Sequence, residues 1–205
     1  MNGSGIRRII PILLVLIIIV AAVWGLIAVG RALFSGGSSP SPSPSVNTGQ
    51  EQLTNTDASH SVRMTVRGPI VAEENAHSYS ITVSNSSRVM TTFVGYVGQQ
   101  VGNEQLGNNV QAYQQFVNAL SRAHLMDGRP LEGSDNNTDG ICATGSLFQF
   151  DVLVNNNSVQ QLWTTTCKGL PGSLKANLVQ VSSLFQKQIP DFKTQMNKIG
   201  GTSAT

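Results

Sequence analysis

The most specific chemical pattern in this chain is a short run of oxygen-bearing side chains. Asp135, Asn137 and Asp139 alternate, and Gly140 follows. Such a run forms the first half of a calcium-binding loop, where alternate oxygens face the ion and glycine permits a sharp turn. The second half is missing, because Ser146 stands where a bidentate Glu is required. The run is therefore typical of a solvated acidic loop, with a calcium site as the alternative and no other cofactor indicated.

Cys142 and Cys167 are the two cysteines of the chain. If a hairpin turn is centred on Asn156, Cys167 lies opposite about Gly145, and Cys142 lies a few residues beyond at the same open end. A disulfide there would close a loop of about 26 residues and stabilise the fold by about 3.5 kcal/mol on the chain-entropy model. An extracytoplasmic compartment, which the apolar run described below predicts, permits this bond.

Catalytic residues are not assigned from the sequence. A catalytic thiol would need His60, His77 or His124 as its base, and no spacing places one of them beside a cysteine. Two cysteines are also too few for a structural zinc site. The sequence lacks G-x-S-x-G, S-x-x-K, H-E-x-x-H and a Gly-rich phosphate loop followed by Lys. These absences favour a binding domain over an enzyme.

Apolar periodicity predicts the elements that must position these residues. A Gly-rich stretch at 95–107 is expected to lead into the first helix, which Asn108 or Asn109 caps. Strands with alternating apolar residues are expected at 62–66, 79–83, 89–94, 148–154 and 159–165. Helices are expected at 110–124, from Ser173 through Phe185, and after Pro190.

These elements predict an α+β fold. We expect an N-terminal transmembrane helix, then a two-layer sandwich of one antiparallel sheet with about five strands and two main helices on one face. Residues 79–85 and 150–156 share a pattern of alternate apolar residues that ends in Asn, and each hairpin precedes a helix. Either a duplicated ββα unit or two ordinary hairpin–helix units explains this pattern.

One uninterrupted apolar run, Ile9–Val29, predicts the transmembrane helix. The run carries no charge and would span roughly 31 Å, close to the hydrocarbon thickness of a bilayer. Arg7 and Arg8 precede it and Arg31 follows, so the positive-inside bias places the N-terminus in the cytoplasm and the rest outside. Trp24 and these Arg residues suit the membrane interface. The alternative, a cleaved signal peptide, usually has a shorter apolar region.

Composition divides the chain into successive segments. The Ser-Pro alternation at 39–45 favours an extended spacer, and with Val46 and Leu53 as the only large apolar residues of 35–60, no core is expected there. The predicted segments are a cytoplasmic N-terminus at 1–8, the transmembrane helix at 9–29, a Ser/Pro/Gly-rich linker at 30–60, an extracytoplasmic α+β domain at 61–199 and a disordered tail at 200–205.

The net charge of +2 hides an uneven distribution. Three of the 13 Lys and Arg residues flank the membrane run. The rest of the chain contains the other ten together with all 11 acidic residues, so its net charge is −1. This charge argues against nucleic acid as a partner. The expected partners are the lipid bilayer, through residues 9–29, and an extracytoplasmic protein or glycan. An envelope hydrolase and an inhibitory or accessory subunit of a membrane complex are the alternatives.

Several stretches together carry a resemblance to a known group of proteins. They are the Arg-Arg-led anchor with its Ser/Pro linker, Val94-Gly95-Tyr96, Ala112-Tyr113-x-x-Phe116, residues 140–145 (GICATG), residues 162–167 (LWTTTC) and Leu184-Phe185-Gln186-x-Gln188-Ile189-Pro190. In these the chain resembles uncharacterised single-pass membrane proteins of Saccharibacteria-like bacteria. The resemblance implies a bacterial envelope setting and assigns no activity.

Overall fold

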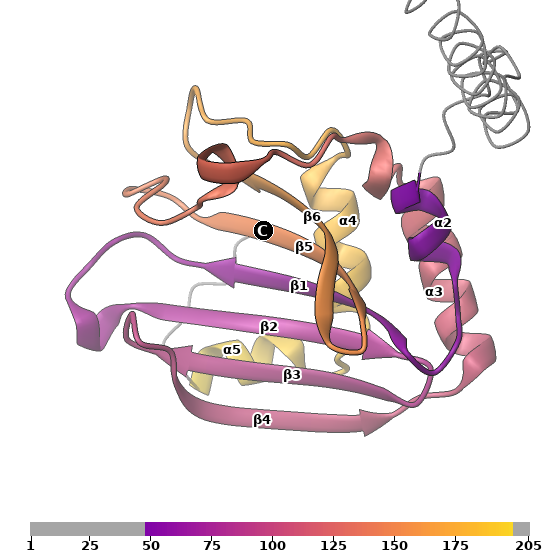
Figure 1. Ribbon diagram of the computed structural model, residues 1–205. Coiled ribbons are helices and arrows are strands. Elements are labelled where there is room, and N and C mark those ends of the chain that lie inside the picture. Colours follow the sequence, from indigo (N-terminus) through magenta and orange to yellow (C-terminus); the bar gives the residue numbers. More distant parts are fainter. Residues whose placement is uncertain (1–47, 199–205) are drawn as a thin grey trace, which may run out of the picture. The chain divides into compact units, whose positions relative to one another are not determined.

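The computed structural model describes residues 48–198, in which one antiparallel sheet has helices on a single face (Figure 1). The predicted membrane run with its flanking Arg7, Arg8, Trp24 and Arg31, most of the linker, and the predicted tail lie outside the described residues. The strands are β1 His60–Arg67, β2 His77–Ser84, β3 Ser87–Val94, β4 Gln99–Gly107, β5 Leu147–Val154 and β6 Asn157–Thr165. The helices are α2 Thr48–Thr54, α3 Val110–Arg122, α4 Leu178–Gln186 and α5 Phe192–Lys198.

Strand β1 lies inside the sheet, whose order is β4-β3-β2-β1-β5-β6. It pairs antiparallel with β2 on one side and with β5 on the other, so that Val62 has both Val83 and Val152 as neighbours. The β2–β3 and β5–β6 hairpins thus extend the sheet in opposite directions from β1. Four strands precede α3 and two precede α4, so the two predicted hairpin–helix units differ in their number of strands.

The core fills the layer between the sheet and the helices. Alternate residues of β1 such as Val62 and Met64 are fully buried on this side, as the strand pattern predicts. The ring of Phe185 in α4 lies edge-on to Phe116 of α3, with centroids 5.2 Å apart, and 5.8 Å from the Phe150 ring of β5. These contacts join both helices to the sheet and confirm the α+β prediction. Within residues 48–198, no helix is both long and apolar enough to cross a membrane.

The sheet has six strands where about five are predicted. The additional strand is β4, which lies in the Gly-rich stretch and pairs with β3 along its whole length. None of its side chains is fully buried, and its outer side lies at the edge of the sheet. Its sequence therefore carries no apolar alternation, and pairing with β3 forms the strand instead.

Helix α4 begins later than predicted. Its cap is Asn177, whose side chain accepts the N–H of Gln180 at 3.0 Å. The hydroxyl of Ser173, the predicted cap, instead accepts the backbone N–H of Trp163 at 3.0 Å. The Ser173 hydroxyl thus bonds to the backbone of β6 and does not cap α4. The cap of α3 is Asn109, one of the two predicted residues.

The linker prediction is wrong at its C-terminal end. Helix α2 lies inside the stretch predicted to be coreless, and Leu53 is fully buried in the main core. Figure 1 shows α2 lying along α3. One leucine is enough to join this stretch to the core, because α3 and the sheet supply the other side chains that surround it. The folded domain therefore includes residues from Thr48 onward, rather than from 61.

We expect Leu53→Ala to lower the free energy of unfolding by about 3 kcal/mol, because it removes a buried side chain and leaves a cavity. Leu170→Ala is the matched control, since Leu170 is 40% exposed, and its effect should stay under about 0.5 kcal/mol. Denaturant unfolding of the full chain measures both. Equal losses would show that α2 does not belong to the domain.

Candidate functional site

Three loops meet at the end of the sheet where β1 stops and β2 starts. They are the β1–β2 loop, the β3–β4 loop and the segment that precedes β5. Between them lies a cavity of about 310 Å³, at the lower end of the range for pockets that bind small ligands. We call it the loop-end pocket, and its lining includes Arg67, His77, Tyr96, Thr138, Asp139 and Ile141.

Hydrogen bonds tie the three loops to one another. The Tyr96 hydroxyl accepts the Val71 N–H at 2.8 Å and donates to the Val71 carbonyl, which joins the β3–β4 loop to the β1–β2 loop. The Ile70 N–H donates to the Ala143 carbonyl at 2.8 Å, which joins the β1–β2 loop to the segment before β5. The walls of the pocket are therefore held together without a ligand.

The predicted disulfide joins Cys142 to Cys167, with their Cα atoms 5.5 Å apart. It lies where the hairpin geometry places it, because β5 and β6 pair in the expected register, with Leu147 opposite Thr165. The bond fastens the segment that contains Ile141 to the end of β6. It thereby fixes one wall of the loop-end pocket.

The polar groups of the pocket include the Arg67 guanidinium, its two oxygen partners and His77. Arg67 donates from Nη2 to the Thr138 hydroxyl, and its Nη1 lies 3.6 Å from Asp139 Oδ1. The side chain of Asp139 is 84% exposed, so this ion pair is weak. The Nδ1 atom of His77 is buried, and no hydrogen-bond partner for it lies among the described residues.

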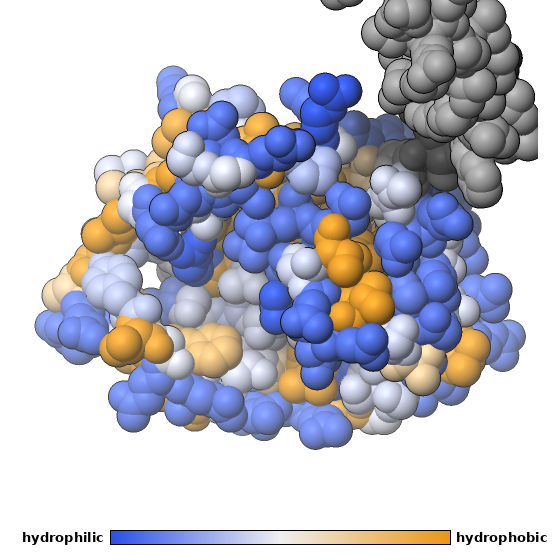
Figure 2. Space-filling model, viewed as in Figure 1, coloured by the Kyte–Doolittle hydropathy of each residue, from blue (hydrophilic) through white to orange (hydrophobic). Residues whose placement is uncertain are grey.

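Apolar residues are exposed in the loops that form the pocket and just beyond them. Of the nine large apolar residues exposed in 48–198, five lie in the two hairpin loops and at the start of β4: Ile70, Val71, Tyr96, Val97 and Val101. We call these five the apolar rim. Figure 2 shows apolar residues gathered at this end of the sheet, on the left of the view. Water solvates these exposed apolar side chains poorly.

The predicted calcium residues do not form a common ligand set. Asp135 belongs to the short 3-10 turn Gly133–Asn136, while the Asn137 side chain accepts the Asp139 N–H at 2.9 Å. Asp139 faces the Arg67 cation, which would oppose a second positive charge. Nowhere in the described part of the chain do three His, Cys, Asp or Glu side chains gather as a metal site requires. Calcium binding stays a prediction.

Asp139 is the one predicted site residue that lines the pocket, and Arg67 and Tyr96 line it although neither is among the predicted site residues. The glycines beside these residues, Gly68 and Gly95, were a sequence signal for tight turns at this site. Gly95 has a φ of 77°, which suits glycine, and a Cβ there would press on the Glu73 side chain at 3.3 Å. Turns of this kind bring distant strand ends together.

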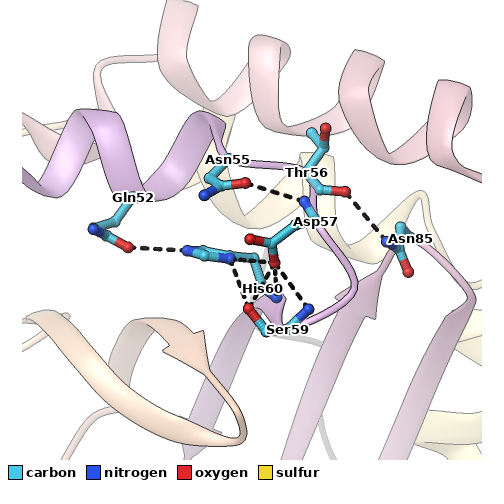
Figure 3. A network of polar contacts seen from close by, with 7 residues as sticks. All are labelled: Gln52, Asn55, Thr56, Asp57, Ser59, His60 and Asn85. Carbon is cyan, nitrogen blue, oxygen red and sulfur yellow. Dashed lines mark hydrogen bonds and ion pairs between the residues drawn. The ribbon is translucent and has the colours of Figure 1, made fainter.

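A second polar cluster contains the residue types of a catalytic triad (Figure 3). His60 Nδ1 lies 2.6 Å from Asp57 Oδ1, and the Ser59 hydroxyl donates to the same oxygen at 2.6 Å. In a triad, Asp and Ser occupy opposite ring nitrogens. Here His60 Nε2 faces Gln52 Oε1 of α2 at 2.9 Å instead. The cluster therefore fastens α2 to β1 and is not arranged for nucleophilic catalysis.

Neither a known protein-family model nor a curated protein matches this sequence.

The acidic end of the pH range tests the Asp57 cluster. The hydrogen bond from Ser59, together with His60, holds the pKa of Asp57 well below its usual range. An aspartate whose pKa is lower in the folded state stabilises the fold at pH values above its unfolded-state pKa of about 3.9. This stabilisation is lost as the pH falls toward the lower pKa of the folded state. Asp57→Asn should lower the Tm at pH 7, with a deficit that shrinks between about pH 4 and pH 2.

Asp135→Asn is the matched control, because this exposed carboxylate lies in the loop before β5. Its Tm should follow that of the wild type at every pH. A deficit for Asp57→Asn that stays constant down to pH 2 would contradict the assigned role of the carboxylate.

Replacing both Cys142 and Cys167 by Ser should lower the free energy of unfolding by about 3.5 kcal/mol. Reducing agent should destabilise the wild type by a similar amount and leave the double variant unchanged. Denaturant unfolding with and without dithiothreitol measures both effects. A wild type that is insensitive to reductant would show that the bond does not form.

Proposed function

We propose that this protein is a membrane-tethered extracytoplasmic binding domain, whose loop-end pocket and apolar rim bind another protein. The observation that carries the proposal is the exposure of five apolar residues in the loops at this end of the sheet, two of which, Ile70 and Tyr96, line the pocket. An apolar side chain of the partner would enter the pocket, while the rim would exclude water around it. Buried centres of this kind supply most of the binding energy in protein interfaces.

The chemistry of the site favours a protein as the partner. Tyr and Arg are enriched in the centres of protein interfaces, and Tyr96 and Arg67 both line the pocket. Ile70, Val71 and Val97 add aliphatic surface, which suits a polypeptide better than a sugar ring. The disulfide and the Tyr96 hydrogen bonds order the loops before binding, which lowers the entropic cost of association.

The location belongs to the proposal as well. Its support is the apolar run at 9–29, the basic residues that precede it and the disulfide, which an oxidising compartment favours. The resemblance to single-pass proteins of Saccharibacteria-like bacteria supports a cell envelope as the setting.

The contacts inside the pocket favour binding over hydrolysis. A hydrolase needs a nucleophile and a base within hydrogen-bond reach of each other. The contacts of Arg67 go to Thr138 and Asp139, and within residues 48–198 no hydrogen bond links His77 Nδ1 to either of them.

Site-specific photo-crosslinking in the protein's own host tests this function. We would place p-benzoylphenylalanine at Val97, which is 90% exposed, and at Val179 of α4, which is 65% exposed. A discrete protein adduct should form at position 97 and not at position 179. Ile70→Asp should reduce the adduct at 97 about tenfold, because a charge on the rim opposes burial of the partner.

As controls, Ile70→Asp and the wild type should be present in membranes in equal amounts and should have the same Tm. Identical adducts at positions 97 and 179, or an adduct at 97 that Ile70→Asp leaves intact, would overturn the proposal.

A further inference from the structure

The two edge strands of the sheet, β4 and β6, differ in the hydrogen bonds that they form with segments outside the sheet. On the β6 edge, the Trp163 carbonyl accepts the N–H groups of Ser173 and Leu174, both at 2.9 Å. The Thr164 hydroxyl also donates to the Pro171 carbonyl at 2.8 Å. The segment that leads to α4 therefore covers the C-terminal end of this edge, at Trp163 and Thr164, and prevents another strand from pairing there.

The β4 edge has no such cover within residues 48–198. Between Gln99 and Leu106, no backbone hydrogen bond to another described segment is formed outside the ladder with β3. The strand also lacks Lys, Arg and Pro, which often protect an exposed edge, and Glu104 is its one charged residue. A bulge at Val101 interrupts the start of the strand, and five regularly paired residues follow it before Gly107.

A groove runs beside this open edge on the helical side of the sheet. Its volume is about 350 Å³, and its walls are Thr92, Val94, Val101 and Gly102 of the sheet with Gln195 and Lys198 of α5. Side chains of a strand point alternately to the two faces of a sheet. Every second side chain of a strand added beside β4 would therefore point toward this groove.

We propose that an extended segment of the partner protein pairs with β4 as an additional strand. Every second side chain is apolar and enters the groove near Val94 and Val101, and a carboxylate lies against Lys198, the charged residue of the groove. The inference rests on the proposed function, because Val101 belongs both to the apolar rim and to β4. One partner chain thus contacts the rim and continues along the edge.

The test begins with a phage library of random decapeptides, selected on the full chain in lipid nanodiscs. Enriched peptides should combine alternate apolar residues with one acidic residue. Each backbone amide of the best peptide is then N-methylated in turn. In an added strand alternate N–H groups face β4, so methylation should weaken binding at least tenfold at every second residue and little at the residues between.

Variants of the protein locate the bound peptide. Val101→Lys should weaken binding at least tenfold, and its matched control is Val159→Lys on β6, the opposite edge strand, where Val159 is 44% exposed. Lys198→Glu should weaken an acidic peptide, and replacing the peptide's acidic residue by Lys should restore affinity. Because charge reversal is compensated in the peptide, a misfolded variant cannot give the same result.

The outcomes separate this inference from the function on which it rests. Tolerance of N-methylation at every position, or no enriched peptide, overturns strand addition even if the Val97 crosslink forms. Loss of the crosslink in Ile70→Asp together with alternating N-methyl sensitivity supports both. A concentration-dependent dimer that Val101→Lys abolishes would show that a second copy of this chain occupies the edge, which overturns the proposed partner.

Discussion

Burial of one side of β1 is the constraint on which the rest of the structure depends. The strand is paired on both sides, and Val62 and Met64 are fully buried beneath the helices. On the opposite side, Arg63 Nη2 lies 3.3 Å from the buried carboxylate of Asp151. A shift of one residue would exchange these two sides and place Arg63 in the core, so the register is strongly determined.

A fixed register decides where the loops of the sheet lie. It brings the β1–β2 and β3–β4 loops to the same end, where the Tyr96 hydroxyl bonds to Val71. The disulfide then adds the segment before β5 as a third wall. Apolar residues that find no place in the core remain exposed around this pocket, and the rim continues into the open edge of β4. Rigid strands thus support the proposed binding surface, which is made largely of loops.

Features that depend on local pattern could be predicted from the sequence, and features that depend on distant contacts could not. Alternating apolar residues located most strands, and the hairpin register predicted the disulfide. Strand β4 was missed because pairing with β3, rather than an apolar face, forms it. The burial of Leu53 requires walls from α3 and the sheet, and the Ser173 hydroxyl bonds to Trp163 rather than capping α4. The pocket itself combines residues from three loops, which no short motif describes.

Amide hydrogen exchange of the full chain tests the central claim most directly, when membranes from its own cells are compared with the purified chain in nanodiscs. The account predicts that native membranes slow exchange in the β1–β2 loop and from Tyr96 to Val101, with exchange in α4 unchanged. Equal exchange at the rim in both samples, or slowing confined to α4 or to the β5–β6 turn, would contradict the assignment of the loop-end pocket and apolar rim as the binding surface.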